Sequence, residues 1–125
     1  HAGMRITPDL VTSLEPDDVF VFGSNAAGAH GGGAARIAHQ RFGAVWGEGR
    51  GHHGQSYAID SMSGLDALAA DAEVFVAYAT AHPELRFLLT PVGCGIAGYA
   101  PAEVAPLFRG VPDNVSVPAS FVPFL

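Results

Sequence analysis

The stretch from Asp17 to Gly43 constrains the fold more than any other part of the chain, because it reads as a strand, a glycine-rich loop and a helix in immediate succession. Residues 19–22 form a continuous Val-Phe-Val-Phe run, which is typical of a strand covered on both faces. The run stops at Gly23, and glycines at positions 28, 31, 32 and 33 follow before Ala34. Such residues accept positive φ or let a ligand approach the main chain.

The helix predicted from Ala34 indicates what this loop could bind. Its apolar residues share one face, and its first turn contains no acidic or strong capping side chain. The first backbone N–H groups are therefore left for an anion, as in a phosphate cradle, although a single glycine-rich turn of this kind more often serves simple tight packing. The known nucleotide fingerprints do not fit, since the chain has no Lys for a Walker loop and offers mainly Glu48 where a Rossmann fold needs an acidic residue.

Composition limits the class of protein. With 125 residues, 49% of them hydrophobic, the chain is expected to form a single domain over residues 4–125, residues 1–3 being an expression remnant. The net charge of −6 with six basic residues argues against unaided binding to duplex nucleic acid. The single cysteine, Cys94, excludes an internal disulfide, and no apolar run is long enough to span a membrane. A cytoplasmic protein without cofactor, metal or membrane partner is expected.

The rest of the chain repeats the first pattern. Strands are predicted near residues 4–7, 55–59, 86–91 and 114–117, and a helix from Ser63 to His82 places Asp66, Asp71 and Glu73 on its polar side. Residues 43–54 show no periodicity and are interpreted as a long functional or disordered loop. Residues 86–91 run into a second glycine loop, and a helix starts at Pro101. Two such loops beside one crevice could hold the two ends of a diphosphate.

Three stretches of the chain resemble, in order, the macrodomain superfamily of ADP-ribose-binding modules. The first is VFGSN with the HGGGAA that follows it, the second is GQSYAID and the third is TPVGCGIAGY. The chain is most similar to the compact bacterial and phage members. The resemblance covers residues 17–108 and implies a three-layer α/β/α fold with a mixed central sheet.

The resemblance also implies roles for individual residues. Asn25 matches the residue that hydrogen-bonds the distal ribose, and Asp9 could match the acceptor for adenine N6. The glycines expected beside the ribose and adjacent phosphate are Gly31, Gly32 and Gly33. The second loop, which wraps the diphosphate in the family, corresponds to Gly93, Cys94, Gly95, Ile96, Ala97, Gly98 and Tyr99, the last being an aromatic residue near the distal ribose.

The family's known catalytic residues are missing. An Asp that follows the glycine run in one branch is replaced by Ala34-Ala35, and the Lys and Asp of another branch correspond to Ser61 and Ala97. Asp60, at the end of a predicted strand, could instead activate water, or it could simply terminate a turn. His30 could act as acid, base or phosphate donor, or be an ordinary loop histidine.

Other residues in these loops are weaker candidates. His52 and His53 are interpreted as lid residues, since no further zinc ligands accompany them. Main-chain donors could lower the pKa of Cys94, but no histidine neighbours it. Trp46 could stack on adenine or plug the edge of the core.

The sequence therefore predicts a protein that binds ADP-ribose or an ADP-ribosylated substrate through two glycine-rich loops. Hydrolysis of the ADP-ribosyl bond is the favoured use of that recognition. The alternatives are a non-catalytic ADP-ribose reader and, last, a structural domain with a degenerate cleft.

Overall fold

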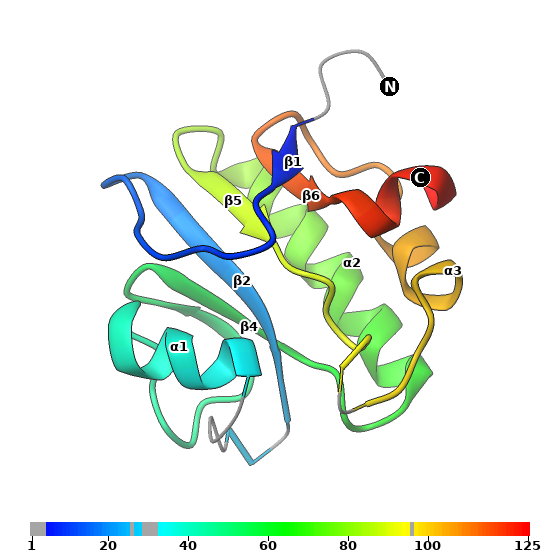
Figure 1. The fold of residues 1–125 in the computed structure, drawn as a ribbon, viewed down its shortest axis with the longest axis horizontal. Coiled ribbons are helices and arrows are strands. Elements are labelled where there is room, and N and C mark those ends of the chain that lie inside the picture. The colour runs from blue at the N-terminus through cyan, green and yellow to red at the C-terminus, as the bar shows by residue number, and fades with distance from the viewer. Residues whose placement is uncertain (1–4, 26, 29–32, 96) are drawn as a thin grey trace.

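The computed structural model describes residues 5–25, 27–28, 33–95 and 97–125, which form a single six-stranded sheet with helices on both faces (Figure 1). The strands lie in the order β1-β6-β5-β2-β4-β3. All neighbouring pairs are parallel except β3–β4. The predicted α/β fold with a mixed central sheet is confirmed. The strand bounds are β1 (Ile6–Thr7), β2 (Asp18–Ser24), β3 (Gly51–His53), β4 (Ser56–Asp60), β5 (Arg86–Leu89) and β6 (Val115–Pro118).

The central strand β2 contributes side chains to both faces of the sheet, which explains its unbroken apolar sequence. Phe20 and Phe22 pack on the face covered by α1 (Gly33–Arg41), whose Ala35 and Ala38 are buried against them. With no large side chain at these two helix positions, α1 can approach the sheet closely. Phe42, just beyond the helix, completes the cluster, and its ring centroid lies 5.1 Å from that of Phe20.

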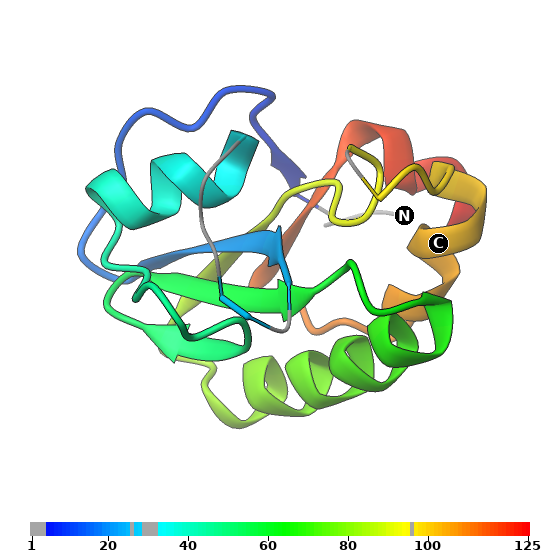
Figure 2. The ribbon, with the colours of Figure 1, turned by 90° about the horizontal axis from the view of Figure 1, so that it is seen from below.

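The opposite face carries the larger core. It is covered by α2 (Leu65–Ala81), α3 (Pro101–Val104) and the 3-10 helices η1 (Ala105–Phe108) and η2 (Ala119–Phe124). Phe75 of α2 is fully buried at the centre, with ring centroids 5.1 Å from Tyr57, 5.5 Å from Phe87 and 6.1 Å from Phe108. Figure 2 shows α1 and α2 on opposite sides of the sheet, which gives the predicted three layers. No helix in the described ranges combines the length and apolarity that a membrane crossing requires.

Three local predictions were wrong. The segment interpreted as a loop contains β3, which pairs antiparallel with β4 through His52 and Tyr57. The N-cap of α2 is Gly64 rather than Ser63, and no side chain caps it. Asp71 is buried rather than on a solvated side, because Arg50 from the long loop pairs with it.

The connections define where a ligand could bind. The chain leaves β2 through α1 to reach β4 on one side, and leaves β5 through α3 and η1 to reach β6 on the other. Because α1 and α3 cover opposite faces, the carboxyl ends of the adjacent strands β2 and β5 diverge into separate loops. Open α/β sheets place their ligand crevice at such a switch point.

Candidate functional site

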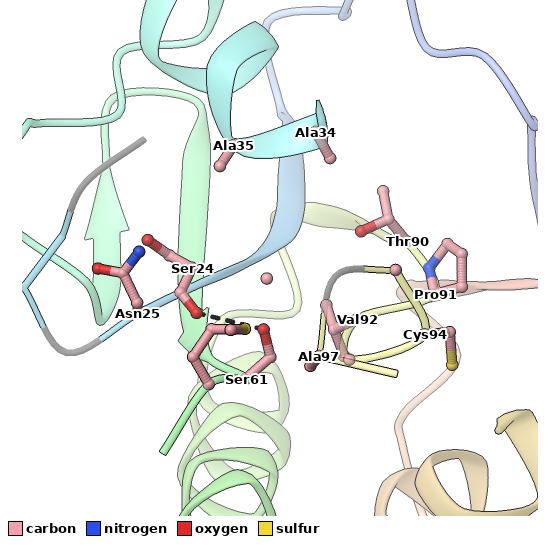
Figure 3. A pocket seen from close by; sticks show the side chains of 14 residues that line it. Ser24, Asn25, Ala34, Ala35, Ser61, Thr90, Pro91, Val92, Cys94 and Ala97 are labelled. Atoms are coloured by element: carbon pink, nitrogen blue, oxygen red, sulfur yellow. Dashed lines mark hydrogen bonds between the residues drawn. The ribbon is translucent and has the colours of Figure 1, made fainter. Parts of the chain in front are cut away.

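A cavity of about 410 Å³ lies at this switch point (Figure 3). Four segments line it: the end of β2, the first turn of α1, the segment after β4, and the loop after β5. The first turn of α1 belongs to one of the two glycine-rich units expected from the sequence, and the loop after β5 belongs to the other. The lining residues are Gly23, Ser24, Asn25, Ala34, Ala35, Ser61, Met62, Thr90, Pro91, Val92, Gly93, Cys94, Gly95 and Ala97.

The floor of this first cavity depends on a glycine. A Cβ added at Gly23 would lie 2.7 Å from Ser61 Oγ, so a larger residue would displace this hydroxyl, whereas the Gly93 nitrogen at 3.6 Å would be in ordinary contact. Ser61 holds the same place from the other side, since its N–H and its hydroxyl both donate to the Ser24 carbonyl, at 3.0 and 3.2 Å. Asn25 follows directly and is thereby placed at the rim of the cavity (Figure 3).

The loop after β5 presents unsatisfied backbone donors. It is closed by hydrogen bonds from Tyr99 N–H to the Gly93 carbonyl at 2.9 Å and from Gly98 N–H to the Gly95 carbonyl at 3.0 Å. The N–H groups of Gly93, Gly95 and Ala97 donate to no acceptor within the described part of the chain. All three residues line the cavity. Successive free N–H groups of this kind form a concave site for an anion.

The first turn of α1 adds to this positive potential. Ala34 and Ala35 line the cavity, and the turn holds no acidic residue. The N–H groups of a first helical turn have no partner within the helix, and the helix dipole favours negative charge there. Two separate backbone elements thus favour an anion in the first cavity.

A second cavity of about 440 Å³ lies beside the first, and Ala34, Thr90 and Pro91 line both. Its walls are mostly apolar, and its polar groups come from Thr7, Asp9, Thr90 and Ser120. The Thr90 hydroxyl is already engaged, because it donates to the Val21 carbonyl at 2.6 Å. Its remaining lining residues are Pro8, Leu10, Val11, Phe20, Ile37, Pro118 and Ala119.

Thr7 is the unusual member of this second cavity. Its side chain is buried, with 4% of its surface exposed, and its Oγ1 has no hydrogen-bond partner in the described structure. Buried hydroxyls are normally paired, and leaving one unpaired costs about 1–3 kcal/mol. Because Oγ1 has almost no exposed surface although Thr7 lines an open cavity, other atoms of Thr7 form that part of the wall, and a ligand there would not reach the hydroxyl.

The structure brings together many of the residues expected from the sequence. Asn25, Gly93, Cys94, Gly95 and Ala97 line the first cavity, and Asp9 lines the second. Gly33 begins α1, while Gly98 and Tyr99 belong to the second loop but do not line either cavity. His30, Gly31, Gly32 and Ile96 lie outside the described residues.

Asp60 does not line either cavity. Its side chain is buried, and Oδ1 accepts the N–H of Met62 at 3.1 Å, which is the turn geometry expected of an Asp at the end of a strand. Its own N–H donates to Asp71 Oδ2 at 2.9 Å. Asp60 therefore organises the segment that supplies Ser61 and Met62 to the first cavity.

The remaining candidates occupy other environments. Cys94 is a lining residue of the cavity, but its side chain packs against the larger core, and burial, and next the charge of Glu103, raise the pKa of its thiol, the opposite of what an activated nucleophile needs. Trp46 is 56% exposed and meets the ring of His39 edge-on. His52 Nδ1 lies 2.6 Å from the Tyr78 hydroxyl, within the sheet rather than in a lid. No group of three potential metal ligands occurs among the described residues.

Sequence reasoning missed Thr7, Thr90 and the ion pair between the exposed Arg50 and the buried Asp71. Thr7 and Thr90 lie at or just after the ends of parallel strands, a position that could have singled them out. The ion pair had no such signal, because its partners are 21 positions apart in different elements.

Comparison of the chain with protein-family models, with curated proteins and with solved structures gave no match. The fold and the two cavities therefore have to indicate the function by themselves.

Proposed function

We propose that this protein binds ADP-ribose, free or attached to a substrate, across the two neighbouring cavities. The observation that carries the proposal is that an anion-seeking cavity and an apolar one are neighbours, since Ala34, Thr90 and Pro91 line both. ADP-ribose has a matching layout, with a flat base at one end, a diphosphate in the middle and a second ribose at the other end. The free N–H groups of the second loop and the first turn of α1 support a diphosphate in the first cavity.

The chemistry of the second cavity supports a base there. Apolar walls favour a flat ring. A carboxylate accepts hydrogen bonds, so Asp9 favours a base with an exocyclic amine, as in adenine. Asn25 lies in the other cavity, which suits the contact with the distal ribose that the macrodomain resemblance implies.

The residues around the first cavity support recognition more directly than hydrolysis. Among its described lining residues, none carries a carboxylate, imidazole or basic side chain. A hydrolytic version of the proposal assigns Asp60 as the base, because it immediately precedes Ser61 and Met62 on the cavity wall. For that role the Asp60 carboxylate would have to leave the N–H of Met62 and reach a water in the cavity.

Titration calorimetry with ADP-ribose, AMP and ribose 5-phosphate tests the proposal on the purified protein. ADP-ribose is expected to bind more tightly than either fragment, because it alone spans both cavities. In a thermal melt, ADP-ribose at a hundred times its Kd should add about 2.7 kcal/mol and raise the midpoint by roughly ten degrees. If millimolar ADP-ribose neither releases heat nor moves the melt, the proposal is wrong.

Asp9→Ala gives a sharper version of the same test. Asp9 is exposed and lines the second cavity, so the unliganded protein should melt near the wild-type temperature. Affinity for ADP-ribose and AMP should fall about three- to tenfold, the value of one hydrogen bond. Ribose 5-phosphate is the control, because it has no base. Equal loss for all three ligands would contradict the assignment of the base to the second cavity.

A further inference from the structure

The long segment after α1 packs directly on the backbone that carries Asn25. Gly47 N–H donates to the Gly28 carbonyl at 2.9 Å, and Gly28 N–H donates to the Asn25 carbonyl at 2.9 Å. A Cβ added at Gly49 would lie 1.8 Å from the Asn25 carbonyl oxygen, and Gly49 is itself buried. Residues 47–49 therefore leave Asn25 no room to move toward them.

An ion pair anchors this segment immediately beyond the contact. Arg50 Nε donates to Asp71 Oδ1 at 2.7 Å, and its terminal NH2 contacts the same oxygen. The Arg50 side chain is 63% exposed, whereas that of Asp71 is only 6% exposed and is fixed in α2. The exposed partner therefore belongs to the loop, and the fixed partner belongs to the core.

Asp71 connects the same anchor to the other side of the site. Its Oδ2 accepts the N–H of Asp60, and the next residue, Ser61, bonds the Ser24 carbonyl directly before Asn25. The residue that precedes Asn25 and the Asn25 carbonyl are thus both tied, through a few contacts, to one buried carboxylate. An ion pair with one largely exposed partner adds little to overall stability, so its main effect is on where residues 47–50 lie.

We propose that Arg50 is a positioning residue, which holds residues 47–49 against Asn25 and so keeps the Asn25 side chain in place for the distal ribose. The ligand in this inference is taken from the proposed binding of ADP-ribose. The support that residues 47–49 give to Asn25, called the brace below, does not depend on any ligand. It gives residues 43–54 a role: the segment supports the ligand loop from behind rather than covering the cavity. The positive φ angles of Gly47 and Gly51, +93° and +92°, are the turns that bring it there.

The matched variants are Arg50→Met and Arg86→Met. Arg86 also forms an ion pair from an exposed position, with Asp18 at 3.1 Å, but it lies at the amino ends of β2 and β5, away from the cavities. Arg50→Met should weaken ADP-ribose binding about tenfold, and Arg86→Met less than twofold. Arg50→Lys should recover part of the loss, because lysine restores the charge but not the forked geometry. Arg50→Met binding as tightly as wild type would overturn the proposal.

Coupling to Asn25 separates positioning from general destabilisation. In an Asn25→Ala background, Arg50→Met should cost no further affinity, since the group it positions is gone. An undiminished tenfold loss in that background would contradict the proposal. Gly49→Ala provides a second route if Arg50→Met folds poorly: it should also weaken binding at least tenfold, while the adjacent exposed Glu48→Ala should not. Wild-type affinity in Gly49→Ala would count against the brace.

Amide hydrogen exchange tests whether the brace exists without any ligand being present. The Gly28 and Gly47 amides, which form the contact, should lose protection in Arg50→Met and keep it in Arg86→Met. If wild type does not bind ADP-ribose, the proposed function fails, and exchange alone judges the brace. Unchanged protection in Arg50→Met would then refute it.

Discussion

Asp60 can be tested as a structural residue and as a catalytic one with a single pair of variants. Its Oδ1 accepts the N–H of Met62 at 3.1 Å, and its carboxylate lines neither cavity. Asp60→Ala removes the acceptor, whereas Asp60→Asn keeps an oxygen in the same position and removes only the charge. The two variants therefore separate the turn from any chemistry.

The expected sizes follow from this one contact. A hydrogen bond to a charged acceptor contributes about 1.5–3 kcal/mol, so Asp60→Ala should lower the free energy of unfolding by that amount. For a domain of this length the midpoint should fall by roughly 5–12 °C. Asp60→Asn should stay within about 1 kcal/mol of wild type. Denaturant unfolding followed by circular dichroism measures both. An Asp60→Ala protein as stable as wild type would refute the role in the turn.

Binding and turnover complete the test. Asp60→Asn should bind ADP-ribose within threefold of wild type, because Asp60 does not face the ligand in the proposed site. Asp60→Ala should bind more weakly, because it loosens the turn that supplies Ser61 and Met62 to the first cavity. Turnover is measured as release of ADP-ribose from an ADP-ribosylated protein or nucleic acid. A lost general base costs about a hundredfold to ten-thousandfold in rate. If wild type releases ADP-ribose and Asp60→Asn loses that much activity with intact binding, Asp60 is the base and the reader form of the proposal is wrong.

Two further outcomes are expected. Ala34→Leu should place a bulky side chain between the two cavities that Ala34 lines. Calorimetry should then show an affinity for ADP-ribose more than tenfold lower and no longer higher than that for AMP, with Ala34→Ser as the small control. An unchanged preference for ADP-ribose would mean that the ligand does not cross this point. Burial, and next the charge of Asp71, raise the pKa of Tyr57 to about 12 from its usual value near 10, so the folded protein keeps this proton while the unfolded chain loses it. The free energy of unfolding should therefore fall as pH rises from 10 to 12, by about 2–3 kcal/mol at most, and Tyr57→Phe should remove that part of the fall in urea melts; an identical pH profile would contradict it.

The fold could be predicted where one residue pattern determines one element. The apolar run of β2 and the helical spacing of α2 both left little choice, since each buries its apolar residues against the same sheet. The strand β3 could not be predicted, because Gly-His-His has no strand pattern and is held only by pairing with β4. The burial of Asp71 escaped for the same reason: it depends on Arg50, which a distant loop brings to it.

The candidate site was predictable in its backbone and less so in its side chains. Glycine loops that follow two parallel strands indicate a shared crevice, and Asn25 and Gly93 indeed line one cavity. The position of the Asp60 carboxylate was not predictable, because a strand-ending Asp can face a ligand or its own turn, and the choice is made by the Met62 N–H. Thr7 carries no sequence signal of being unpaired, since that depends on every neighbour around it.

The open backbone donors of the second loop argue against a degenerate cleft. The N–H groups of Gly93, Gly95 and Ala97 donate to no acceptor in the described part of the chain, and all three residues line the first cavity. Elsewhere the same protein satisfies demanding groups, as where the Asn114 amide donates to the carbonyls of Ala79, His82 and Leu85. An anion in the first cavity would accept hydrogen bonds that no group in the described part of the chain accepts.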